Sequence, residues 1–292
     1  KNNQVISSGV TGINGRPHAE ANAIKNSLIN VNGSTLYVTL EPCNHYGKTP
    51  PCTKSIIRSG IKEVFYSIND IDNKVKGKSF KILIKKKIKV RRGLLRKEAI
   101  DLYDSYIVNR KYRVPFVTAK IAVSKNKLIY SEKVKKITSL TSDKLSHYLR
   151  FKNDGLMISS NTLNIDNPKL NCRLNGYEKY SPKRIILDKN LKIDLKSYVV
   201  KSIKNKNTII FYNSNNKIKK NFLIKKGALL INQPTQRHKN FDLKKILKKL
   251  YMIGIKNLLV EGGDKLTKSF LQKRMFNEFY MFKSSKNLLK EN

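Results

Sequence analysis

The sequence has few cysteines and no long apolar run. It contains 3 cysteines in 292 residues, too few for a disulfide framework. No apolar stretch approaches the roughly 18 residues that a membrane-spanning helix requires. These absences exclude a disulfide-stapled secreted domain and an integral membrane protein. We therefore expect a soluble protein of a reducing compartment, located in the cytoplasm.

Acidic residues are also scarce. The chain has 20 of them against 61 lysines and arginines, which gives a formal net charge of +41. Such a charge ordinarily indicates binding to nucleic acid or another anionic surface, because clustered cations release counterions from phosphates. Here the lysines are spread along the whole chain, in clusters such as 85–87 and 244–249 that suit exposed helix or strand faces. Two interpretations of the lysine excess stay open. The lysines could lie on solvated faces of a chain with biased composition, or they could bind a partner or substrate that carries phosphate.

The remaining composition predicts folded domains of the α/β class. A hydrophobic content of 39% and an aromatic content of 9% exclude a wholly disordered basic tail, and the length suits about two domains. Extended and helical segments alternate along the chain. We expect strands at 5–10, 35–40, 63–68, 116–122, 155–159, 184–188, 208–212, 257–260 and 279–282, and helices at 19–28, 52–59, 97–109, 142–151, 241–251 and 265–272. Ser142 or Thr141 is the expected cap of the helix at 142–151.

The two domains are expected to meet near residue 112. Pro115 breaks the pattern there before a new strand begins, which predicts domains at 1–112 and 113–292. The chain starts at Lys1 without methionine, and residues 5–10 already have the pattern of the middle of a strand. We therefore expect truncation at the N-terminus, and the same pattern leaves room for a missing strand or two after residue 292.

The strongest chemical signal is a set of metal ligands. His18, Cys43 and Cys52 supply one imidazole and two thiolates, which leaves the fourth tetrahedral position of a zinc ion for water. Zinc acidifies such a water, and Glu20 can carry its proton to a departing amine. The expected helices place His18 and Cys52 at two N-termini, whose dipoles favour thiolates. The pattern therefore predicts a catalytic zinc site.

One alternative is a closed structural zinc site with His45 as the fourth ligand. That reading leaves Glu20 and the preceding Arg16-Pro17 without a role, so we assign His45 to the support of a substrate loop. Zinc deaminases typically carry His-x-Glu followed by Pro-Cys-x-x-Cys. Here eight residues separate Cys43 from Cys52.

Residues 39–52, Thr-Leu-Glu-Pro-Cys-Asn-His-Tyr-Gly-Lys-Thr-Pro-Pro-Cys, explain this longer spacing. They closely resemble the deaminase domain of the bifunctional riboflavin-biosynthesis deaminase/reductase family. The resemblance implies a cytidine-deaminase-like three-layer fold and an insertion that helps to hold a phosphoribosylated pyrimidine. It assigns the zinc ligands to His18, Cys43 and Cys52 and the proton shuttle to Glu20. Residues 69–78 resemble the family's segment after the third strand, whereas its amino-terminal helix and Pro-Asn-Pro-x-Val-Gly motif are missing, which supports truncation.

The second half alone gives weaker signals. Residues 260–263, Val-Glu-Gly-Gly, end a strand before a helix and could cradle a phosphate with backbone N–H groups. Arg150 and Arg173 could converge on the same phosphate. An ordinary turn and a solvated arginine pair are the alternatives.

The same family carries a dihydrofolate-reductase-like α/β domain after its deaminase domain. Segments that match it in order are 115–122, 137–139, 149–150, 161–162, 166–170, 184–188 and 261–263. The resemblance implies that the ribosyl phosphate substrate contacts Arg150, Leu170, Arg173 and Glu261, and that NADPH contacts Ala122, Thr162, Asp166 and the segment from Gly263. Hydride would pass from the nicotinamide to the opened ribose carbon, with the protein orienting both partners.

Three segments depart from the family's pattern. Ser-Leu-Asp-Gly is replaced by residues 124–127, Trp-Ile-Thr by 136–138, and Asp-Glu-Leu by 277–279. The first change, with Lys125, Asn126 and Lys127, predicts an altered loop beside the cofactor and a slow or divergent reductase. We interpret Cys172 as a packed cysteine, and His147 and His238 as structural or surface residues.

These observations together predict a bifunctional enzyme of riboflavin biosynthesis. Its first domain would use Zn²⁺ to deaminate a diaminopyrimidinone that carries a phosphoribosylamino group, and its second would use NADPH to reduce the ribosyl group of the resulting uracil to ribityl. The expected partners are this small-molecule substrate and further copies of the chain, with no membrane and no nucleic acid. The alternatives are a nucleic-acid base deaminase, favoured by the charge, and a zinc-binding module with a decayed reductase.

Overall fold

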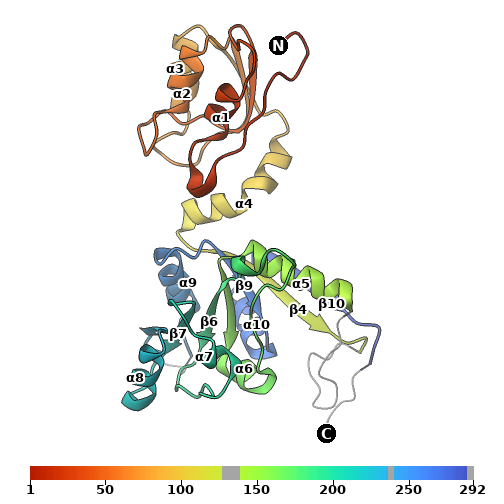
Figure 1. The fold of residues 1–292 in the computed structure, drawn as a ribbon, viewed down its shortest axis with the longest axis vertical. Helices are drawn as coiled ribbons and strands as arrows, with labels where there is room; N and C mark the ends of the chain where they lie inside the picture. The colour runs from red at the N-terminus through yellow and green to blue at the C-terminus, as the bar shows by residue number, and fades with distance from the viewer. Residues whose placement is uncertain (127–138, 236–239, 288–292) are drawn as a thin grey trace. The chain divides into compact units, whose positions relative to one another are not determined.

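The computed structural model describes residues 1–126, 139–235 and 240–287. The chain forms two compact units, Lys1–Lys111 and Tyr112–Asn292 (Figure 1). The predicted residues Lys127, 136–138 and His238 lie outside the described residues. Within the described ranges, no helix is both long enough and apolar enough to span a membrane.

The first unit is built on a three-stranded parallel sheet in the order β1-β2-β3. Its elements in chain order are η1 (Ile13–Gly15), α1 (Ala19–Lys25), β1 (Thr35–Leu40), α2 (Cys52–Arg58), β2 (Glu63–Ile68), α3 (Lys78–Lys85), β3 (Lys89–Arg92) and α4 (Arg96–Tyr112). The core is formed where Ile56 of α2 and Leu83 of α3 pack on Val64 of β2, and all three side chains are fully buried. β1 and β2 have the predicted bounds.

The predicted strand at residues 5–10 is wrong. This segment forms no ladder and instead runs along α1, where the Ser7 hydroxyl donates to the Ala23 carbonyl and the Asn22 amide donates to the Val10 carbonyl. A Cβ at Gly9 would clash with the backbone of α1, so glycine permits the close approach. The valines that suggested a strand are exposed, at 92% for Val5 and 79% for Val10.

The second unit is a seven-stranded parallel sheet in the order β10-β4-β9-β5-β6-β7-β8. Its strands are β4 (Phe116–Val123), β5 (Gly155–Ser159), β6 (Lys183–Leu187), β7 (Thr208–Tyr212), β8 (Leu229–Asn232), β9 (Asn257–Glu261) and β10 (Glu278–Lys283). Its helices are α5 (Leu140–Lys152), α6 (Ser160–Asp166), η2 (Glu178–Tyr180), α7 (Tyr198–Lys201), α8 (Lys217–Lys225), α9 (Leu243–Met252) and α10 (Asp264–Gln272).

Helices cover both faces of this sheet. Alternate residues of each strand point to opposite faces, so Ile185 and Ile186 of β6 belong to two different cores. One core contains the buried residues of α9 and α10, and the other contains those of α5, α6, α7 and α8 (Figure 1). Burial on both faces explains the near-continuous apolar runs in the central strands.

The helix starts differ in detail from the prediction. Ser139, and neither Thr141 nor Ser142, caps α5, because its hydroxyl oxygen accepts a hydrogen bond from the Ser142 N–H at 3.2 Å. Asp242 caps α9, so Phe241 lies before the helix and not in it. No prediction covered α3, α6, α7, α8, β3 or β8, which are short and lysine-rich or lack a clear periodicity.

Candidate active sites

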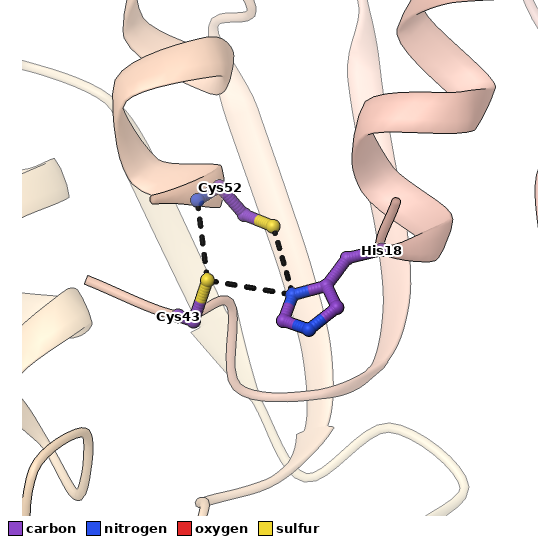
Figure 2. A group of neighbouring side chains, drawn as sticks. All are labelled: His18, Cys43 and Cys52. Carbon is purple, nitrogen blue, oxygen red and sulfur yellow. Dashed lines mark hydrogen bonds between the residues drawn. The ribbon is translucent and has the colours of Figure 1, made fainter. Parts of the chain in front are cut away.

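The three predicted metal ligands converge in the first unit. Figure 2 shows His18 at the start of α1, Cys43 after β1 and Cys52 at the start of α2 turned toward one point. His18 Nδ1 lies 3.4 Å from the Cys43 sulfur and 3.3 Å from the Cys52 sulfur. The Cys52 N–H donates to the Cys43 sulfur at 3.3 Å. Residues from three separate elements thus form one cluster with both sulfurs buried.

The donor set and spacing fit a zinc ion. Tetrahedral zinc with Zn–S near 2.3 Å and Zn–N near 2.0–2.1 Å places nitrogen and sulfur ligands about 3.5 Å apart. The nitrogen–sulfur separations in the cluster agree with that value within a few tenths of an ångström. Among the described residues, this is the one group of three or more ligating side chains, and it does not include His45. The geometry therefore favours three protein ligands over the closed site.

Glu20 lies beside the cluster in the first turn of α1. Its side chain is 7% exposed and interacts with the thiol of Cys52. Burial raises the pKa of Glu20 above its ordinary value, against the opposing effects of a backbone hydrogen bond and the charge of His18. A carboxyl group with a raised pKa is suited to hold and release a proton near neutral pH.

The two thiols differ in acidity. The hydrogen bond from Cys52 lowers the pKa of Cys43 to about 4, and the same hydrogen bond, together with burial, raises the pKa of Cys52. A bound zinc ion deprotonates its thiol ligands outright, so both sulfurs would bind zinc as thiolates.

The loop between the cysteines contains polar atoms without partners. Asn44 Oδ1 and His45 Nδ1 are buried and have no hydrogen-bond partner, and the same is true of Arg16 Nε. Unpaired buried polar atoms are rare in native proteins and call for an explanation such as an unseen water, ion or ligand. A polar substrate that enters beside the cluster could satisfy them, and the role of His45 in supporting a substrate loop stays a prediction.

The second unit has a cavity of about 700 Å³ at the carboxyl ends of β4, β5 and β9. Six of the eight predicted reductase residues line it: Ala122, Thr162, Asp166, Leu170, Glu261 and Gly263. Ligands of parallel α/β sheets bind at this edge. Burial raises the pKa of Asp166. Arg150 and Arg173 do not line the cavity.

Arg150 is paired with Glu261 in a buried ion pair. Its Nε and Nη2 atoms donate to the two carboxylate oxygens at 2.8 and 2.7 Å, and Nη1 donates to the Asn171 carbonyl at 3.2 Å. Burial opposes ionisation of Glu261, but the charge and hydrogen bonds of Arg150 prevail and lower the pKa of Glu261. Arg173 instead donates to the Asn171 side chain. The two arginines therefore have different partners, and the convergence of both on a phosphate stays a prediction. The alternative of a solvated pair is wrong for Arg150.

The sequence did not single out Lys120, which lies beside Glu261. Lys120 of β4 is the register partner of Glu261, lines the cavity, and has its pKa lowered by burial. A lysine in the middle of the apolar stretch 116–123 was the available signal. His147 has a structural role, as predicted: its Nδ1 accepts a hydrogen bond from the Arg173 N–H. Burial, together with the charges of Arg150 and Arg173, lowers the pKa of His147.

The glycine turn after β9 is held close to α6. The Gly263 N–H donates to the Thr162 hydroxyl at 3.3 Å, and the Thr267 hydroxyl donates to the Gly262 carbonyl at 3.0 Å. Gly262 has φ 140°, a conformation that favours glycine. A Cβ at Gly263 would lie 3.0 Å from the Thr162 hydroxyl oxygen. The N-terminus of α10 then faces the cavity, as expected for an anion cradle.

Two departures from the family's pattern fall in described residues. Asn277 takes the place of an aspartate, and its Oδ1 accepts the Val117 N–H at 2.8 Å while its own N–H donates to the Val117 carbonyl. This asparagine therefore still joins β4 to the segment before β10. Ser124 is fully buried and donates to Asn126 Oδ1. Cys172 is fully buried against the His147 carbonyl, which confirms its packing role.

Comparison with known proteins agrees with both sites. Residues 115–288 match the family model of the RibD C-terminal domain, and residues 1–68 match the cytidine and deoxycytidylate deaminase zinc-binding region. The riboflavin biosynthesis protein RibD of Aquifex aeolicus is 35% identical over 97% of this chain and 78% of its own length. The chain belongs to the RibD family.

Solved structures support this assignment. Acinetobacter baumannii RibD superposes with a TM-score of 0.84 at 26% identity, covering 99% of this chain and 79% of that one. A second solved structure, from Thermotoga maritima, is described as a diaminohydroxyphosphoribosylaminopyrimidine deaminase/5-amino-6-(5-phosphoribosylamino)uracil reductase. It superposes with a TM-score of 0.83 at 30% identity, covering 99% of this chain and 79% of that one.

This RibD-family chain is thus an enzyme of riboflavin biosynthesis with deaminase and reductase activities. The predicted fold class and the expected cofactors, Zn²⁺ and NADPH, are confirmed. The match of residues 115–288 to a reductase model disfavours the alternative of a nucleic-acid base deaminase.

Proposed function

We propose that residues 1–112 deaminate a phosphoribosylated diaminopyrimidinone and that residues 113–292 reduce the deaminated product. The convergence of His18, Cys43 and Cys52 beside Glu20 carries the first half of this proposal. The cavity lined by the predicted reductase residues supports the second half. The two activities would then use separate sites in separate units.

His18, Cys43 and Cys52 would hold the zinc ion. When bound, zinc acidifies a water molecule and so supplies a nucleophile at neutral pH. Glu20 takes up the proton that this water loses and delivers it to the amino group, so that ammonia leaves and a carbonyl forms. The raised pKa of Glu20 makes the carboxylate a competent acceptor that can also donate. Asn44 and His45, with their unpaired buried atoms, contact the substrate's polar groups.

In the second unit, NADPH would lie in the cavity against Ala122, Thr162, Asp166 and Gly263. When bound, it supplies a hydride for the opened ribose carbon. Glu261 and Leu170 also line the cavity and would contact the substrate, and Arg150 fixes the orientation of the Glu261 carboxylate. Arg173 would reach the substrate phosphate from the neighbouring loop, where its guanidinium is exposed and donates to the Asn171 side chain. Cytoplasmic location and homo-oligomeric assembly remain predictions.

The Glu20→Gln variant tests the deaminase half. The amide keeps the shape of the side chain but cannot accept the proton, so we expect deamination to fall by about 10²–10⁴-fold with zinc content unchanged. The control is Glu98→Gln on the exposed surface of α4. Deamination and metal content would be measured by mass spectrometry of the product and by elemental analysis. Full activity in the Glu20→Gln protein would refute the assigned role.

A further inference from the structure

Glu41 is a buried acidic residue directly before the zinc-ligand loop. It lies two residues before Cys43 in the sequence Leu40-Glu41-Pro42-Cys43, and it is 3% exposed. Its carboxylate faces a distant segment of the first unit: Oε2 accepts from the N–H groups of Asp70 at 3.2 Å and Gly77 at 3.0 Å. Oε1 accepts from the Ser79 N–H at 3.2 Å. Three backbone donors from one segment therefore converge on a single side chain.

These donors include the N-terminus of α3. Gly77 is the N-cap of this helix and has no side chain, so it offers no cap of its own. The first N–H groups of a helix need acceptors from elsewhere, and a negative charge is favoured there. Glu41 supplies that acceptor from the end of β1, which ties residues 70–79 to the strand that leads into Cys43.

The same segment also contacts the metal ligands. The Ser79 hydroxyl donates to the Pro42 carbonyl, one residue before Cys43. Val75, which lies between the two anchored ends, is 1% exposed and packs in one cluster with Cys43 and Cys52. The position of this valine over the sulfurs thus depends on the hydrogen bonds that hold both ends of its segment.

We infer that Glu41 is a positioning residue for deamination: its carboxylate anchors residues 70–79 so that Val75 covers the two cysteine ligands and the Cys43 loop keeps its place. This inference rests on the proposed zinc site. Partners of metal ligands that fix ligand orientation typically change activity or metal affinity by about 10–100-fold when they are replaced. Glu41 acts through the backbone and through Val75, without touching the substrate.

The Glu41→Gln variant tests the inference in the full chain. The amide nitrogen cannot accept a hydrogen bond, so at least one of the three backbone donors loses its partner. We expect hydrogen exchange in a peptide spanning residues 69–80 to become at least about 10-fold faster, and kcat/KM for deamination to fall by about 10–100-fold. In the Co²⁺-substituted protein, the thiolate charge-transfer and d–d bands should shift, because the Cys43 and Cys52 ligands are displaced.

The matched control is Glu63→Gln at the start of β2, where the carboxylate pairs with Lys89 and Arg91 on the surface. It should change none of the three readouts. Val75→Ala keeps the Glu41 hydrogen bonds, and it should shift the Co²⁺ bands without the faster exchange of the 69–80 peptide. Should Glu41→Gln fail to fold, unchanged bands in Val75→Ala would overturn the inference.

Two results would have different meanings. If wild-type protein with Co²⁺ shows no thiolate charge-transfer band, the proposed zinc site itself is wrong. If the wild-type band is present but Glu41→Gln leaves the bands and the turnover per cobalt unchanged, even with faster exchange, Glu41 is only a structural anchor and the inference fails.

Discussion

The buried pair of Arg150 and Glu261 yields the sharpest quantitative prediction. Both side chains are almost enclosed, with 13% and 12% exposed, and two hydrogen bonds of 2.8 and 2.7 Å join them. Removal of one member of such a pair leaves an uncompensated buried charge, which costs about 3–5 kcal/mol of unfolding free energy. Glu261→Gln leaves two cations, Arg150 and Lys120, without an acidic partner. We therefore expect it to lower the free energy of unfolding by close to about 5 kcal/mol.

Arg150→Met should lower the free energy of unfolding by less, about 3 kcal/mol, because Lys120 still lies near the Glu261 carboxylate. The double variant Arg150→Met/Glu261→Gln removes both members of the pair, so that Lys120 alone is left without its acidic partner. We therefore expect it to be more stable than the sum of the single effects by about 2–3 kcal/mol, the range for residues in direct contact.

The assay is hydrogen exchange of the peptide that contains β9, measured across a urea series for all four proteins. This local readout reports the second unit alone, which matters because two units can unfold in separate transitions. Single-variant costs below about 1 kcal/mol, or additive costs in the double variant, would refute the reasoning, since those values describe exposed ion pairs.

Three further predictions concern the cofactors and pH. Removal of zinc with a chelator should abolish deamination but leave NADPH-dependent reduction of the deaminated pyrimidine intact, and parallel loss of both activities would contradict separate sites. Gly263→Val should raise the KM for NADPH at least about 10-fold by crowding Thr162, with deamination unchanged; an unaltered KM would remove this turn from the cofactor site. The folded-state pKa of Glu261 lies below its ordinary value of 4.5, so its contribution to stability is fully present above that value and is lost as pH falls through the lower pKa. In Arg150→Met the pKa of Glu261 is no longer lowered by the arginine, so this loss of stability should begin at a higher pH. Unfolding measured at a series of pH values checks it.

Local patterns predicted much of the fold because many elements have a strong periodicity. β1, β2, β5 and β7 have the expected bounds. β1, β2 and β7 are rich in β-branched and aromatic residues, and β5 is a short apolar run that begins at a glycine. The segment 5–10 has the same composition but lies where no neighbouring strand pairs with it, and composition alone cannot reveal that. β3 is only Lys89–Arg92, with three of its four residues basic, so its strand character comes from pairing with β2.

The sites were predictable to different degrees. Cysteine and histidine are common zinc ligands, and this chain has only 3 cysteines and 4 histidines, so the sequence pattern could identify the zinc cluster. In the second unit, pairing is decided by three-dimensional neighbours. The Arg150–Glu261 pair joins residues 111 positions apart, and Lys120 meets Glu261 only because β4 and β9 are adjacent strands. The anchoring role of Glu41 likewise depends on residues 29 to 38 positions away.

The central claim is that one chain first deaminates and then reduces the same pyrimidine. The most direct measurement is a time course of product masses from the full chain with Zn²⁺ and the phosphoribosylated diaminopyrimidinone, with and without NADPH. We expect the deaminated product to accumulate without NADPH, and to rise and then fall as the reduced product forms with NADPH. Deamination that never proceeds to reduction would show a decayed reductase. A substrate that stays unchanged in both reactions would contradict the assignment of this pyrimidine as the substrate.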